Sequence, residues 1–145
     1  MGQQQLLLLV LVVILVGAAL VPVSTIFLST ATQNNRDAII NDLLNLSAKS
    51  QRYYRTPTQL GGGSNSYDGF ALSPSDTGNA NGSFSLSRTE PSGSAFVPGS
   101  TGPLSATNGS FYIIGCGKEL GENQSTPVKC YIKITKSTTN VTILN

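Results

Sequence analysis

Residues 1–23 read MGQQQLLLLVLVVILVGAALVPV, and this stretch limits the folds that the rest of the chain can adopt. Three glutamines lead, without any charge, into the apolar run Leu6–Val23. A transmembrane helix needs about 20 apolar residues to cross roughly 30 Å of hydrocarbon. The segment Leu6–Leu28 meets that length even though it includes Ser24 and Thr25. We therefore expect a helix that spans a bilayer.

Two other interpretations of this segment are weaker. A secretory signal peptide carries Lys or Arg before its apolar core and a small-residue cleavage site after it, whereas the core here follows Met-Gly-Gln-Gln-Gln. A buried helix of a soluble protein needs other elements to cover it, and nothing else in the chain is apolar enough to do so. The segment therefore inserts into a membrane or packs against copies of itself.

Composition excludes several functions. The chain has 145 residues, which suits one domain, and its net charge of +2 comes from scattered basic residues. Scattered charge of this kind gives no support to a nucleic-acid partner. The chain has no histidine, the side chain best suited to proton transfer near neutral pH, and its serines therefore lack the usual activating base. We expect no catalytic residues, no cofactor and no enzymatic activity.

Residues 30–55 read TATQNNRDAIINDLLNLSAKSQRYYR and have the period of an amphipathic helix. Pro57 and the Gly61–Gly63 run that follows should end it. If this helix continues from the apolar segment, about 50 residues at 1.5 Å each make a rod of about 75 Å. The apolar positions at three- and four-residue steps are Ile39, Ile40, Leu43, Leu44, Leu46, Ala48 and Tyr53 or Tyr54.

This two-part helix resembles the N-terminal segment of bacterial type IV pilins and of the related pseudopilins of type II secretion. In that family the mature chain begins with a methylated residue, reaches a glutamate just before an apolar helix, and carries a helix-breaking proline late in the apolar run. Gln5 stands where the family has its glutamate, Leu6–Val16 form the apolar run, and Pro22 matches the proline. The resemblance covers the first 55 residues well and the remainder only in outline.

The resemblance implies a structural subunit that leaves the inner membrane and assembles, through its apolar helix, into an extracellular filament on the cell surface. The implied partners are other copies of the chain, the inner membrane before assembly, and a pilus assembly machinery. A pseudopilin of a secretion or DNA-uptake system and a single-pass, membrane-anchored adhesion or binding domain are the alternatives. The residues that the resemblance assigns to filament assembly are Met1, Gln5, Leu6, Leu9, Val13, Gly17 and Pro22.

The chain departs from the family pattern at two points. The family's glutamate is thought to neutralise the N-terminal amine of a neighbouring subunit, and Gln5 can hydrogen-bond that amine without cancelling its charge. We hypothesise that amide contacts among Gln3, Gln4 and Gln5 take its place. No basic leader ending in glycine precedes Met1, so either the leader is already absent from this sequence or processing differs, for example after Gly2.

Pro22 should weaken the apolar helix. A proline inside a helix deletes one backbone hydrogen bond and costs about 3 kcal/mol unless neighbours compensate. Gly17 and the small Ala18 and Ala19 lie just before it, so we expect the segment from Gly17 to Pro22 to be the weakest part of the helix. In filaments of the resembled family this region is often unwound, whereas the alternative here is a simple kink in a membrane anchor.

The last third of the chain reads as β-structure. Val128, Cys130, Ile132 and Ile134 alternate with Lys129, Tyr131, Lys133 and Thr135, which indicates a strand with one buried and one wet face. A further strand is expected near 140–144, and Tyr112, Ile114 and Cys116 share a face of the strand before.

The two cysteines suggest a disulfide. With Cys116 and Cys130 on adjoining strands and directed to the same core, a bond between them would close a loop of about 15 residues and contribute roughly 3 kcal/mol. The resembled pilins often carry such a bond. Two buried free thiols are the alternative, and a zinc site is less favoured because the chain has no histidine to complete the ligand set.

Two further site types have weaker signals. Glu119 and Glu122, beside a carbonyl-rich turn, could bind calcium as loops of some pseudopilins do. Glycosylation is a second option, although a chain rich in Asn, Ser and Thr produces Asn-X-Ser/Thr triplets by chance. These triplets begin at Asn45, Asn81, Asn108, Asn123 and Asn140.

The sequence thus predicts an α+β protein in which one long N-terminal helix packs on a small antiparallel β-sheet. Residues 1–28 form the apolar helix, 29–56 the amphipathic helix, and 57–145 a β-rich head whose middle, up to about Ser110, is loop-rich.

Overall fold

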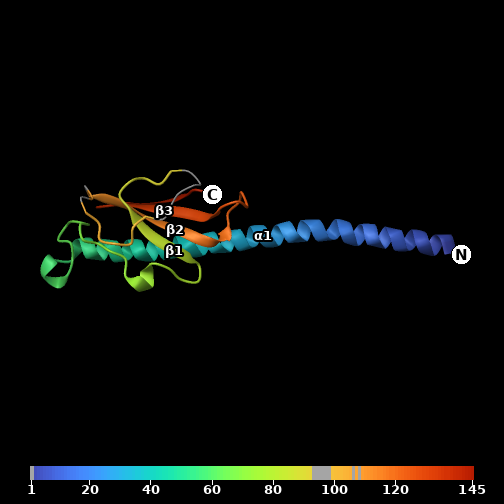
Figure 1. The fold of residues 1–145 in the computed structure, drawn as a ribbon, viewed down its shortest axis with the longest axis horizontal. Coiled ribbons are helices and arrows are strands. Elements are labelled where there is room, and N and C mark those ends of the chain that lie inside the picture. The colour runs from blue at the N-terminus through green and yellow to red at the C-terminus, as the bar shows by residue number, and fades with distance from the viewer. Residues whose placement is uncertain (1, 93–98, 106, 108) are drawn as a thin grey trace.

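The computed structural model describes residues 2–92, 99–105, 107 and 109–145, and of Val21 only the backbone. Within these residues one long helix precedes an antiparallel sheet with the strand order β1-β2-β3-β4. The sheet lies along the C-terminal half of the helix, whose N-terminal half extends alone from the head (Figure 1). The predicted α+β architecture is confirmed. The elements are α1 (Gly2–Arg55), the 3-10 turns η1 (Thr58–Leu60) and η2 (Pro74–Asp76), and the strands β1 (Gly82–Ser87), β2 (Ser110–Leu120), β3 (Pro127–Thr135) and β4 (Thr139–Ile143).

Helix α1 is unbroken over 54 residues, which corresponds to about 80 Å. Pro22 lies inside it and has no N–H to donate to the carbonyl one turn earlier. The hydroxyl of Thr25 donates to the Pro22 carbonyl at 2.9 Å. The segment from Gly17 to Pro22 is therefore helical here, and its expected weakness stays a prediction.

One face of the second half of α1 is buried against the sheet. Ile39, Leu43 and Leu46 lie on it, as the periodicity predicts. The same face also buries Ser47 and Ser50, whose hydroxyls donate to carbonyls three residues earlier at 2.8 and 2.7 Å. A serine that satisfies its own hydroxyl within the helix can be buried at little cost.

The predicted apolar stripe is wrong at two positions. Leu44 is 44% exposed and Ala48 is also exposed. Each helical residue turns the side chain by about 100°, so Leu44 and Ala48 lie well away from the line through Leu43 and Ser50. The buried stripe is consequently narrower than the sequence suggests.

Glycines in the sheet allow the helix to approach closely. A Cβ added at Gly82 or at Gly115 would lie 2.6 Å from the side chain of Ile39, and one added at Gly117 would overlap the side chain of Asn35. Gly82 pairs with Gly117 across β1 and β2. Glycine inside a strand often marks such a close approach, and here it makes room for Ile39, which is fully buried.

The main core lies between α1 and the sheet. Val128, Cys130, Ile132 and Ile134 all face it, which confirms the predicted alternation along β3. The opposite face is less wet than predicted, because Tyr112, Ile114 and Tyr131 form a second, smaller cluster there. The other core side chains are Ile39, Leu43, Leu46, Tyr67, Phe70, Leu72, Phe84, Leu86, Leu104, Phe111 and Ile113.

The predicted disulfide is wrong for this structure, in which both cysteines are free thiols. Cys130 pairs with Gly115 and Cys116 pairs with Lys129, so the two cysteines direct their side chains to opposite faces of the sheet. Cys130 lies in the main core and Cys116 packs against the outer cluster. Joining them would require a one-residue slip, which would turn over every side chain of one strand. The arrangement matches the free-thiol alternative.

The buried thiol predicts a loss of stability at high pH. Burial raises the pKa of Cys130 from 9.0 to about 11. In the unfolded chain the thiol ionises first, so the free energy of unfolding should fall as the pH rises from 9 to 11. Urea unfolding followed by far-UV circular dichroism measures this slope. The Cys130→Ala variant should show a shallower slope than the wild type. Equal slopes would show that the buried Cys130 thiol does not cause the loss of stability.

Close packing at Gly115 predicts a second stability effect. Gly115→Ala should lower the free energy of unfolding of the full chain in detergent by about 1–3 kcal/mol, because the new methyl overpacks the site of Ile39. Near-UV circular dichroism of the buried tyrosines reports the transition. Gly78→Ala is the matched control, since a Cβ there has its nearest contact at an ordinary 3.5 Å. Equal stability of the two variants would show that the close approach is not restrictive.

Candidate membrane and assembly surface

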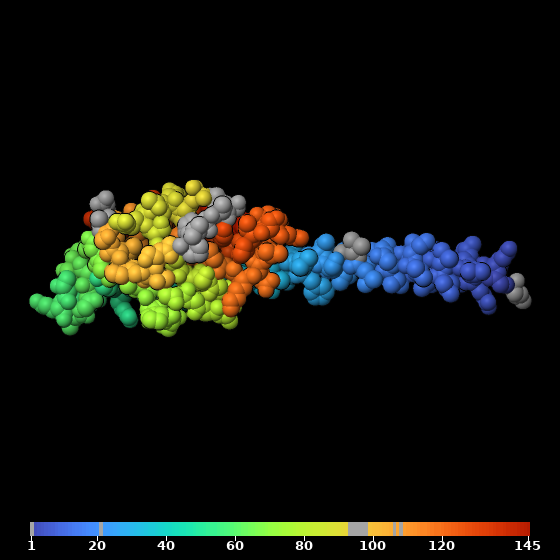
Figure 2. All heavy atoms as spheres, viewed as in Figure 1, coloured from blue at the N-terminus to red at the C-terminus, as the bar shows by residue number. Residues whose placement is uncertain are grey.

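The first half of α1 is not covered by the head, and we call it the bare half. Every large apolar side chain that the structure describes between Leu6 and Leu28 is 47–72% exposed. Figure 2 shows this half as a rod that extends beyond the head. Monomers in water rarely expose contiguous apolar patches larger than a few hundred Å². This surface therefore needs lipid or another protein around it.

The dimensions of the bare segment match those of a bilayer. The 23 residues from Leu6 to Leu28 extend about 35 Å, against roughly 30 Å of hydrocarbon. The mean hydropathy of the helix reaches 3.2 over its most apolar window, none of which is buried. Arg36 is the first charged side chain in the sequence. By length and composition, α1 is able to anchor the chain in a membrane.

Most of the assembly residues proposed from the family resemblance lie on one face of the bare helix. Leu6, Leu9, Val13 and Gly17 follow steps of three and four, so they share one face, and the three apolar side chains are exposed. A Cβ added at Gly17 would have no other atom within 4 Å, so the missing side chain leaves a notch in this face. Pro22 lies on the other side of the helix by the same spacing. Met1 is outside the described residues.

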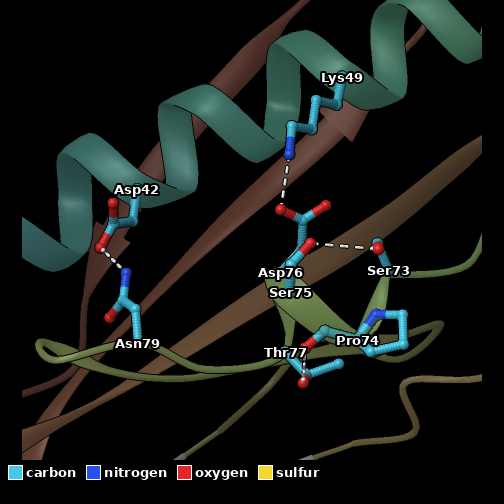
Figure 3. A network of polar contacts seen from close by, with 8 residues as sticks. All are labelled: Asp42, Lys49, Ser73, Pro74, Ser75, Asp76, Thr77 and Asn79. Carbon is cyan, nitrogen blue, oxygen red and sulfur yellow. Dashed lines mark hydrogen bonds and ion pairs between the residues drawn. The ribbon is translucent and has the colours of Figure 1, made fainter.

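Polar contacts connect the head to one side of the second half of α1. The amide of Asn79 donates to Asp42 at 2.8 Å, and Lys49 forms an ion pair with Asp76 at 2.6 Å (Figure 3). Asn81 donates to the same carboxylate oxygen of Asp42 at 3.0 Å. Exposed ion pairs contribute little by themselves, so these contacts orient the head and the apolar core supplies most of the stability.

The head meets the bare segment at a junction that sequence reasoning missed. The hydroxyl of Thr32 donates to the carbonyl of Leu120 at 2.8 Å. Arg36 Nη2 donates to the backbone oxygen of Asn145 at 2.9 Å. These partners lie 88 and 109 residues away along the chain. Sequence periodicity relates residues that are close along the chain, so it cannot predict contacts between residues this far apart in the sequence.

The structure describes four of the five glycosylation triplets. Asn45, Asn123 and Asn140 are exposed, in α1, in the β2–β3 connection and on β4. The side-chain amide of Asn81 donates to Asp42, and that of Asn123 donates to Thr126. Asn108 is outside the described residues. Glycosylation stays a prediction for all five.

The described residues show no metal centre. In the described part of the chain, no three Cys, Asp or Glu side chains are grouped so as to hold a metal ion. Glu119 and Glu122 are both exposed near the junction, and calcium binding there stays a prediction. Comparisons with protein-family models, with curated proteins and with solved structures find no match.

A charge in the bare segment should weaken membrane anchoring. Arg at the centre of a spanning helix costs about 2.5–3.5 kcal/mol, so Val13→Arg should reduce the share of the chain that stays in the carbonate-resistant membrane fraction. Asn34→Arg, on an exposed position of the same helix beyond the apolar segment, is the matched control and should stay in that fraction. If both variants remain in the membrane equally, the bare segment is not the anchor.

Proposed function

We propose that the chain is a structural subunit that self-assembles, through the bare half of α1, into an extracellular filament of the type IV pilus kind. The observation that carries the proposal is the division of one helix into two halves. One half is covered by a folded head, and the other presents apolar side chains in every direction. A rod with a head at one end can bundle through its bare half while the heads stay outside in water.

Before assembly, the same half would lie in the inner membrane with the head outside it. Lipid tails are as apolar as leucine side chains, so moving the helix from lipid into a bundle of helices exposes nothing to water. Packing must then drive association, and the shared face of Leu6, Leu9 and Val13 with its notch at Gly17 supplies a surface for it. An assembly machinery would carry out the transfer.

The head supports this arrangement with apolar side chains of its own. Val141 and Ile143 are 37% and 48% exposed. Val141 and Ile143 belong to β4, an edge strand of the sheet. Subunits held by their helices would bring such surfaces near neighbouring heads, which would add contacts to the filament.

Shearing the surface of source cells tests the proposal. Filaments that contain this chain should be released from wild-type cells and be absent from cells that lack the gene, as seen by negative-stain electron microscopy and mass spectrometry. Short assemblies confined to the periplasm would instead indicate a pseudopilin. A chain that stays monomeric in detergent and never leaves the membrane would indicate an anchored binding domain. Either result would overturn the proposal.

The glutamines before the apolar segment give a more specific prediction. Gln5→Leu should reduce the number of filaments per cell, because leucine cannot hydrogen-bond the N-terminal amine of a neighbouring subunit. Gln59→Leu, an exposed glutamine in η1, is the matched control and should leave the count unchanged. Counting sheared filaments at equal protein levels measures both. An undiminished count for Gln5→Leu would rule out a role for this amide.

A further inference from the structure

A cavity lies where the head meets the bare half of α1. It has a volume of about 390 Å³, with Thr25, Leu28 and Arg36 among its helix-side lining and Glu119, Leu120 and Glu122 on its other side. The latter belong to the end of β2 and the connection to β3. Figure 1 shows this connection at the end of the head from which the bare helix emerges. The cavity is therefore at the base of the head.

Its depth corresponds to the headgroup layer of a membrane. The lining of the cavity runs from Thr25 to Arg36 along the helix, about 16 Å, and so includes the end of the apolar segment at Leu28. If Leu6–Leu28 fill the hydrocarbon, the polar layer of the bilayer, about 5–7 Å thick on each side, begins at that residue, and the Cα of Arg36 lies about 12 Å beyond it. The cavity then extends from the edge of the hydrocarbon across the headgroup layer, and Arg36 lines its outer end.

The lining carries both signs of charge beside apolar side chains. Arg36 lines the cavity and is partly exposed, and its Nη2 donates to the backbone oxygen of Asn145. A guanidinium suits a phosphate group. The carboxylates of Glu119 and Glu122 are exposed opposite and suit an ammonium group. Leu28 and Leu120, both half-exposed, can contact the glycerol and the first methylenes.

We propose that this cavity binds the phosphoethanolamine headgroup of a membrane phospholipid while the chain is anchored. A primary ammonium can donate hydrogen bonds to carboxylates, whereas the methylated ammonium of phosphocholine cannot, and phosphoglycerol has no cation. One bound headgroup would fix the depth and rotation of the subunit in the bilayer before assembly. The proposal rests on the membrane anchoring of α1 and not on filament formation.

Lipid retention tests the proposal on the full chain. The protein is reconstituted in vesicles of equal phosphatidylethanolamine, phosphatidylcholine and phosphatidylglycerol, extracted in mild detergent, and the retained lipid is measured by native mass spectrometry. Phosphatidylethanolamine should be enriched over phosphatidylcholine by up to about fivefold, the factor that one exposed ion pair supports. The Glu119→Gln/Glu122→Gln double variant should retain the two lipids equally. Asp37→Asn, an exposed carboxylate on α1 that does not line the cavity, should behave as the wild type.

The results that would contradict headgroup binding can be told apart from one another. Equal retention by the wild type, or enrichment that survives the double variant, would overturn the proposal. A lipid-free dimer that the double variant weakens would assign the cavity to a contact between subunits, and would also overturn it. Carbonate extraction of the same samples separates these failures from a failure of anchoring, which would overturn the membrane placement as well.

Discussion

The close packing of Ile39 against the glycines of β1 and β2 determines how α1 and the sheet meet. Because Gly82 and Gly115 have no side chain, the helix lies close enough to the sheet for Ile39 to be fully buried. This contact sets the position of the head along α1, so that the junction falls at Thr32 and the large apolar side chains described between Leu6 and Leu28 stay exposed. The length of the bare helix thus depends on glycines far along the chain.

The uncovered apolar part of α1 is the feature on which the proposed function rests. A side chain that faces lipid in one state and a neighbouring helix in another needs no polar partner in either. With no charge before Arg36, the same surface would suit both of the proposed states. In the proposed membrane state, the junction, with its charged and apolar lining, is where the environment would change from hydrocarbon to water.

Sequence reasoning reached the architecture but not the details that depend on register. Helix length and the alternation along β3 are local patterns, and both were predictable. The faces of β2 were not, because Phe111 and Ile113 on one side are as apolar as Tyr112 and Ile114 on the other. Because of this ambiguity, Cys116 was expected to face the same core as Cys130, whereas it packs against the cluster on the opposite face. Gly115 and Gly117 offered a signal, since glycine inside a strand indicates a close approach.

Cryo-electron microscopy of material sheared from the source cells tests the central claim most directly. A helical reconstruction should fit this chain with the bare half of α1 in the filament axis and the heads outside, and it would show whether the segment from Gly17 to Pro22 remains helical. A filament whose core is made by the heads, with the apolar helices turned outward or absent, would contradict the account.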